Sequence, residues 1–100
     1  MPAVNTYYEF NGELSVWNTG KADKNLRKHG VRFEEAATVF FDPMFVLMDA
    51  SRSDETRHAA IGFDLAGRLL YVVHIEVNES FIRIISARRA EPKEESIYDF

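Results

Sequence analysis

The chain has 100 residues, 46% of them hydrophobic, which is the size of one small domain. Its net charge is −4 and it has no cysteine, which excludes a disulfide framework and a thiolate metal site. The first residues lack the features of a secretion signal, and no apolar run approaches the roughly 20 residues of a membrane helix. We therefore expect a protein of the reducing cytoplasm that does not enter a membrane.

The beginning of the chain allows two interpretations. Residues 1–13 can be a loose N-terminal arm or an extra strand, and a single domain is expected over residues 14–100. Residues 14–17 alternate between apolar and polar side chains, which is typical of a short strand.

A first helix is predicted from Lys21 to His29. Asn18 or Thr19 can cap its N-terminus, and Gly30 can supply the left-handed residue that ends it. The cations of its last turn complement the helix dipole.

A second helix is predicted by an apolar stripe that begins at Phe33. Apolar residues recur at positions i, i+3, i+4, i+7 and i+8 of this segment, which ends at Asp42-Pro43. Glu34 and Glu35 lie in the first turn, where acidic side chains favour the positive end of the dipole.

The rest of the chain carries strand signals. Apolar or alternating runs at 44–48, 57–63, 68–77 and 81–88 are separated by short turn segments, which favours an antiparallel meander, and a short helix is predicted after Pro92. This order predicts an α+β fold with two N-terminal helices packed on a three- to four-stranded antiparallel sheet, followed by a short C-terminal helix. The open face of such a sheet can hold a ligand.

Cations gather in two blocks although the chain is acidic overall. Residues 21–32 hold five cations and one acid, giving +4, and residues 81–90 hold three arginines and no acid, giving +3. Arginine suits bidentate contact with phosphate, and cations converging on one phosphate can stabilise the dianionic transition state of RNA cleavage without a metal. The alternative is that these side chains are solvated or paired with acids. The candidates are Lys21, Arg57, Arg83 and Arg88.

Strand alternation complicates this hypothesis. Strict alternation over residues 81–88 directs Arg83 and Arg88 to opposite faces of the sheet. A bulge or turn near the strand end can redirect Arg88, so Arg83 is the better supported of the two.

Histidines and aromatics add weaker candidates. His29 can act as an acid or cap its helix, while His58 and His74 can share a face of neighbouring strands. Two histidines without a third ligand make a poor metal site, so no metal and no cofactor are predicted. Trp17 and Tyr98 can stack on a base or belong to the core.

Five sequence blocks follow one another from about Leu14 to Tyr98. They are Trp17-Asn18-x-x-Lys21, Asn25-Leu26-x-Lys28-His29-Gly30-Val31-x-Phe33-x-x-Ala36, Arg57-x-x-x-Ile61-Gly62, Gly67-Arg68-Leu69-Leu70 and Ile82-Arg83-Ile84-Ile85-Ser86-Ala87-Arg88-x-Ala90. In this order and with this spacing they resemble the BrnT toxin family. The resemblance implies a toxin of a type II toxin–antitoxin system with a RelE-like ribonuclease fold. It further implies metal-independent endoribonuclease activity that cleaves RNA and inhibits translation.

The same resemblance implies partners and site residues. A ribbon-helix-helix antitoxin similar to BrnA would neutralise the toxin, and operator DNA would be bound only through that antitoxin. The assembly would be a dimer or a toxin–antitoxin heterotetramer. The implied catalytic positions are Lys21, Arg57, Arg83 and Arg88, and the implied RNA-binding positions are Trp17, Lys28, His29 and Arg89.

The chain also departs from the family pattern. Asn18 replaces an acid, Thr56 replaces a glutamate, His74 replaces an aromatic, and residues 92–96 are acidic where the family is basic. These departures motivate a second hypothesis, a catalytically degenerate binding module that complexes its antitoxin and tunes operon repression. A third hypothesis is a plain structural interaction domain.

Overall fold

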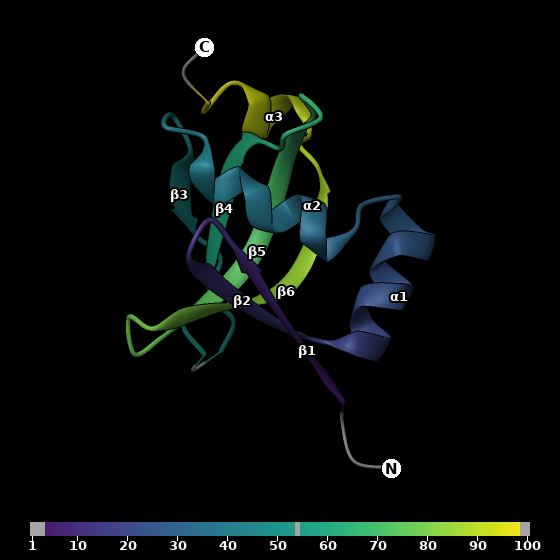
Figure 1. Ribbon diagram of the computed structural model, residues 1–100. Coiled ribbons are helices and arrows are strands. Elements are labelled where there is room, and N and C mark those ends of the chain that lie inside the picture. Colours follow the sequence, from purple (N-terminus) through teal and green to yellow (C-terminus); the bar gives the residue numbers. More distant parts are fainter. Residues whose placement is uncertain (1–3, 54, 99–100) are drawn as a thin grey trace.

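The computed structural model describes residues 4–53 and 55–98. Within these residues the chain forms a six-stranded mixed sheet, three α-helices and one 3₁₀ helix (Figure 1). The strands are β1 (Asn5–Phe10), β2 (Glu13–Asn18), β3 (Val46–Asp49), β4 (His58–Phe63), β5 (Leu69–Val77) and β6 (Phe81–Arg89). The helices are α1 (Thr19–His29), α2 (Phe33–Ala37), η1 (Thr38–Phe41) and α3 (Pro92–Glu95).

The observed sheet differs from the predicted one in its number of strands and in their directions. Its strand order is β1-β2-β6-β5-β4-β3, and β2 pairs with β6 in parallel while the other neighbours are antiparallel. The prediction of two N-terminal helices on a three- to four-stranded antiparallel sheet is wrong, because a hairpin precedes α1 and joins the same sheet. The β2–β6 contact pairs Ser15 with Ile82 and Val16 with Arg83, and no local sequence pattern signals a pairing between segments so far apart.

The N-terminal hairpin is set by its turn. Asn11 has φ 50° and Gly12 has φ 84°, so both turn residues are left-handed, as a two-residue type I′ hairpin requires. The turn fixes the register, in which Phe10 lies opposite Glu13. Residues 5–10, for which the sequence left an arm and a strand open, form β1.

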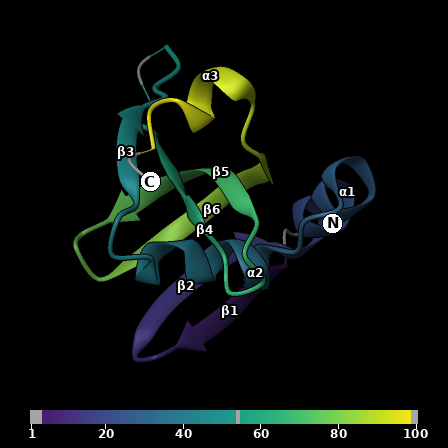
Figure 2. The ribbon, with the colours of Figure 1, turned by 90° about the horizontal axis from the view of Figure 1, so that it is seen from above.

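The main core lies between the helices and one face of the sheet. Figure 2 shows α2 between the β1–β2 hairpin and the strands β4 to β6, so the sheet curves around this helix. Trp17 contacts Phe33 of α2 edge to face, with ring centroids 5.7 Å apart. The segment predicted as one helix is α-helical only to Ala37 and then 3₁₀, which brings η1 close to β4. At this approach a Cβ on Gly62 would lie 2.9 Å from side-chain atoms of Phe45 and Val39.

The opposite face of the sheet is covered at one end by the C-terminal segment. Ile61, Leu69 and Tyr98 form a second cluster there. The Tyr98 hydroxyl donates to the Asp42 carboxylate at 2.6 Å, and the Phe63 amide donates to the same oxygen at 2.8 Å. Although partial burial opposes ionisation, these hydrogen bonds lower the pKa of Asp42. No helix of the described residues is long and apolar enough to cross a membrane.

Candidate functional site

A β-bulge in β6 decides where its arginines point. Val73 of β5 pairs with Ser86 and His74 pairs with Ile84, so Ile85 is an extra residue without an opposite partner. The bulge reverses the alternation that the sequence suggested. Arg83 lies opposite Ile75 and Arg88 opposite Tyr71, and both of these β5 residues belong to the face turned away from α2. The two arginines therefore share one face of the sheet.

Arg57 lies close to the same face. It precedes β4 by one residue, and continuing the register in which His58 pairs with His74 places it opposite Ile75. Ile75 is in turn opposite Arg83. Two strand spacings of about 4.8 Å separate the backbones of Arg57 and Arg83, or roughly 10 Å in total. We call the surface formed by Arg57, Ile75 and Arg83 the arginine face.

The two guanidinium groups of this face have different neighbours. The Arg57 side chain is 24% exposed, and its Nε donates to the Glu55 carboxylate. The Arg83 guanidinium contacts the Asn5 side-chain oxygen at 3.4 Å, and no ion pair to it is present in the part of the chain that the structure describes. Arg83 is thus the more available cation.

Lys21 approaches this region from α1. Asn18 caps the helix by accepting a hydrogen bond from the Lys21 amide at 2.9 Å, and Asn18 lies opposite Asn5 in the β1–β2 pair. Arg83 also contacts Asn5. The paired residues Asn5 and Asn18 therefore connect the first turn of α1, which holds Lys21, with Arg83. The Lys21 side chain is exposed.

Arg88 is engaged by a buried acid. Its two terminal nitrogens donate to the two carboxylate oxygens of Glu94 at 2.7 and 2.8 Å, and its guanidinium lies 4.3 Å from the centre of the Tyr71 ring. The hydrogen bonds to Glu94 raise the pKa of Arg88, and those from Arg88 lower the pKa of Glu94, which is only 4% exposed. The contact holds α3 against the end of β6.

The remaining predicted RNA-binding residues divide into two groups. Lys28 and Arg89 are exposed, and His29 is partly exposed at the C-terminus of α1. Burial, followed by the charges of Lys28 and Arg88, lowers the pKa of His29, so the imidazole favours its neutral form. Trp17 is 2% exposed within the core. A ring so enclosed offers no face to a base.

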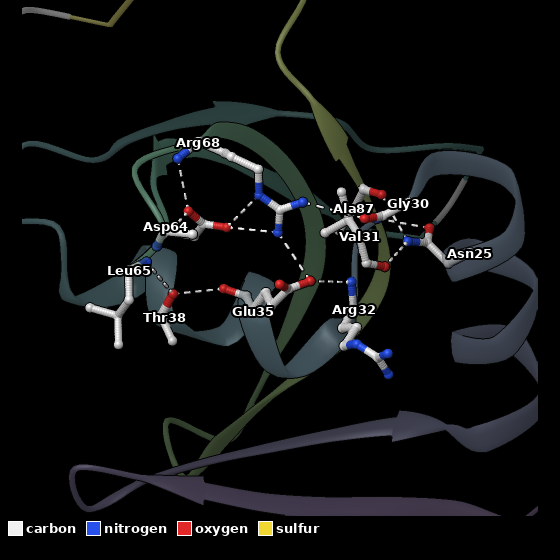
Figure 3. Close-up of polar contacts among 11 residues, drawn as sticks. Asn25, Gly30, Val31, Arg32, Glu35, Thr38, Asp64, Leu65, Arg68 and Ala87 are labelled. Atoms are coloured by element: carbon white, nitrogen blue, oxygen red, sulfur yellow. Dashed lines mark hydrogen bonds and ion pairs between the residues drawn. The ribbon is translucent and has the colours of Figure 1, made fainter.

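Sequence reasoning missed the polar network that joins the helices to the β4–β5 turn (Figure 3). Arg68 donates to Asp64 at 3.0 Å and to the Gly30 carbonyl at 3.3 Å, and it lies 3.0 Å from a Glu35 oxygen. Burial opposes the charge, but the hydrogen bonds to Asp64 and Glu35 raise the pKa of Arg68. The same Glu35 oxygen accepts from the Arg32 amide at the start of α2. The Gly67-Arg68 block, which belongs to the resemblance noted above, thus has a structural role.

Comparison with known proteins shows the family of this chain. A family model described as the ribonuclease toxin, BrnT, of type II toxin–antitoxin systems matches residues 17–94. The chain belongs to the BrnT family. A search of curated proteins found no match. BrnT proteins are ribonuclease toxins, so membership implies an RNA target and an antitoxin partner.

The BrnT match leaves out most of the N-terminal hairpin. It begins at Trp17, after β1 and the first four residues of β2, and it includes the bulged strand and both arginines of the arginine face. Among the described residues, no group of three or more histidine, aspartate or glutamate side chains could hold a metal ion.

Proposed function

We propose that this BrnT-family chain is a metal-independent endoribonuclease that cleaves RNA and thereby inhibits translation in the cytoplasm. The observation that carries the proposal is the orientation of Arg83, which the bulge places opposite Ile75 on the arginine face; Arg57, one residue before β4, reaches the same face if the register of β4 with β5 continues by one residue. In this proposal Arg57 and Arg83 bind the scissile phosphate and Lys21 steadies the substrate.

The chemistry requires positive charge where negative charge develops. The ribose 2′-oxygen attacks the adjacent phosphorus, a dianionic five-coordinate transition state forms, and the bond to the 5′-oxygen breaks. Guanidinium groups stay protonated and donate two parallel hydrogen bonds to phosphate oxygens, so two of them stabilise this state by direct contact. Lys28, His29 and Arg89 would then contact the RNA backbone further along, and Arg88 would hold the strand end through Glu94.

The test is cleavage of a labelled RNA by the purified chain in the presence of EDTA. We expect cleavage to persist, and Arg57→Ala and Arg83→Ala to lower its rate about 100-fold each, because each removes a hydrogen-bond donor to the transition state. Arg27→Ala, which removes an exposed cation of α1, is the matched control and should change the rate less than twofold. Equal rates in all variants would contradict the proposal.

A second candidate is the catalytically degenerate module. It is supported by the contacts of Arg57 with Glu55 and Arg88 with Glu94, which occupy two of the four candidate catalytic cations. This candidate predicts no cleavage by the native chain but stable binding to a ribbon-helix-helix antitoxin, as a dimer or heterotetramer that reaches operator DNA only through the antitoxin. Recovery of cleavage in Thr56→Glu would identify loss of catalysis in a former enzyme.

A further inference from the structure

A pocket of about 380 Å³ opens on the concave side of the sheet, away from the arginine face. Its walls come from the β1–β2 hairpin, from α2 and η1, and from the β5–β6 turn, which are brought together by the curvature seen in Figure 2. Phe10 and Phe41 meet edge to face on one wall with ring centroids 5.1 Å apart, and Phe40 and Phe81 add further aromatic surface. The pocket thus has apolar, aromatic sides.

Three carboxylates surround the pocket. Glu13, Glu76 and Glu79 line it, and none of the described lining residues is a lysine, arginine or histidine. Within residues 4–53 and 55–98, no ion pair or side-chain hydrogen bond engages these three acids. Their negative charge is therefore available to a ligand, and it disfavours the phosphates of a nucleic acid.

A serine side chain lies among these acids. Ser15 lines the pocket from β2 and is 4% exposed, and its position opposite Ile82 puts its side chain on the concave face. Its hydroxyl forms no hydrogen bond with another described residue. The Ser15 hydroxyl opens into the pocket, where it can accept a hydrogen bond from a ligand that brings a donor.

We propose that the pocket binds an arginine side chain, flanked by apolar residues, on a segment of a protein partner. The guanidinium supplies the donors that the carboxylates and the Ser15 hydroxyl lack, and its planar, weakly hydrated group packs against aromatic rings better than an ammonium does. The apolar flanking residues cover the phenylalanines at the rim. The identification of this partner as the antitoxin rests on the proposed function.

The test is a titration of the ¹⁵N-labelled full chain with the peptide N-acetyl-Leu-Arg-Leu-amide, followed by NMR. We expect shifts of the backbone amides of Ser15, Glu79 and Phe81. The control peptide replaces arginine with citrulline, which has nearly the same shape but no charge, and it should bind at least fivefold more weakly. Glu13→Gln combined with Glu79→Gln should weaken binding of the arginine peptide similarly, whereas Glu95→Gln, which changes an exposed acid of α3, should not.

Three outcomes would overturn the proposal. The first is equal binding of the arginine and citrulline peptides to the native chain, a comparison that does not depend on the folding of any variant. The second is a set of shifts on the arginine face instead of the pocket. The third is a pocket whose resonances move with protein concentration alone, which would identify a second copy of the chain as the occupant. RNA cleavage is measured separately with Arg57→Ala and Arg83→Ala, so either proposal can fail without the other.

Discussion

Asn25 closes the open edge of β6 by exchanging two hydrogen bonds with the backbone of Ala87. Its amide nitrogen donates to the Ala87 carbonyl at 2.8 Å and its oxygen accepts from the Ala87 amide at 3.1 Å. The nitrogen also donates to the Val31 carbonyl at 3.1 Å (Figure 3). Because β2 pairs with β6 only at Ser15 and Val16, this side chain replaces a neighbouring strand where the strand has ended.

Replacing Asn25 should destabilise the fold. Asn25→Ala leaves the buried amide and carbonyl of Ala87 without partners, and we expect the free energy of unfolding to fall by about 2–4 kcal/mol. Urea denaturation measures the change. Asp23→Ala, an exposed substitution on the same helix, is the control and should stay within about 0.5 kcal/mol of the native chain. A small effect of Asn25→Ala would mean that water or a shifted strand satisfies Ala87.

The Arg88–Glu94 contact should produce an acid-sensitive component of stability. Hydrogen bonds from Arg88 lower the pKa of Glu94 below its ordinary value of 4.5, so the unfolded chain binds the proton more readily than the folded one. Stability is therefore full above pH 4.5 and is lost as the pH falls through the lower folded pKa. We expect Glu94→Gln to be less stable than the native chain at pH 7 and to show a flatter stability profile between pH 5 and 3. If stability fell with the same slope in the native chain and in Glu94→Gln between pH 5 and 3, the stabilising role of the Arg88–Glu94 contact would be contradicted.

His74 should add a pH dependence in a higher range. It is 1% exposed, its ring contacts Phe40 edge to face at 4.8 Å, and burial lowers its pKa below 6.5 despite the opposing effect of Glu76. Since the unfolded chain binds more protons there, stability should fall as the pH drops below 6.5. His74→Phe keeps an aromatic ring and should make this dependence smaller between pH 6.5 and 5 in thermal unfolding, leaving the part that comes from His29. The control is His58→Gln, which removes only the last of the causes that lower the pKa of His74, and it should retain most of the dependence.

Two glycine substitutions should have opposite effects. Gly62→Ala places a methyl group 2.9 Å from side-chain atoms of Phe45 and Val39, and we expect a loss of about 1–3 kcal/mol because η1 must move away from β4. Gly20→Ala lies in α1, where the new methyl group meets only an ordinary contact with Asn18 at 3.4 Å. It should be neutral or stabilise by up to about 1 kcal/mol. The same urea series measures both variants, and equal effects would contradict the close approach.

Local signals in the sequence located the individual elements better than their assembly. The sequence predicted an N-cap at Asn18 or Thr19 and a left-handed Gly30 for α1, and the structure has the cap at Asn18 and Gly30 with φ 70°. The Asn11-Gly12 pair is the signal in the sequence that points to the hairpin of β1 and β2. The parallel pairing of β2 with β6 could not be inferred, because it depends on how α1 and α2 return the chain to the sheet.

In the candidate site, too, the sequence indicated the residues but not their orientation. Arg57, Arg83 and Arg88 could be selected as cations near strand ends, but the face that each one occupies could not be determined. Ile84 and Ile85 are chemically identical, so the sequence does not show which one is the bulged residue. The buried acid that engages Arg88 was equally invisible, because Glu94 lies in a segment whose composition suggests only solvent-exposed charge.

The bulge at Ile85 also has an evolutionary consequence. One inserted residue sets the relative direction of the arginines on either side of it, so removal of a single codon would turn one of them toward the helices while leaving every cation in the gene. Relatives could therefore lose or regain the shared direction of these arginines by a one-residue insertion or deletion, and comparisons that count only substitutions would not detect the change.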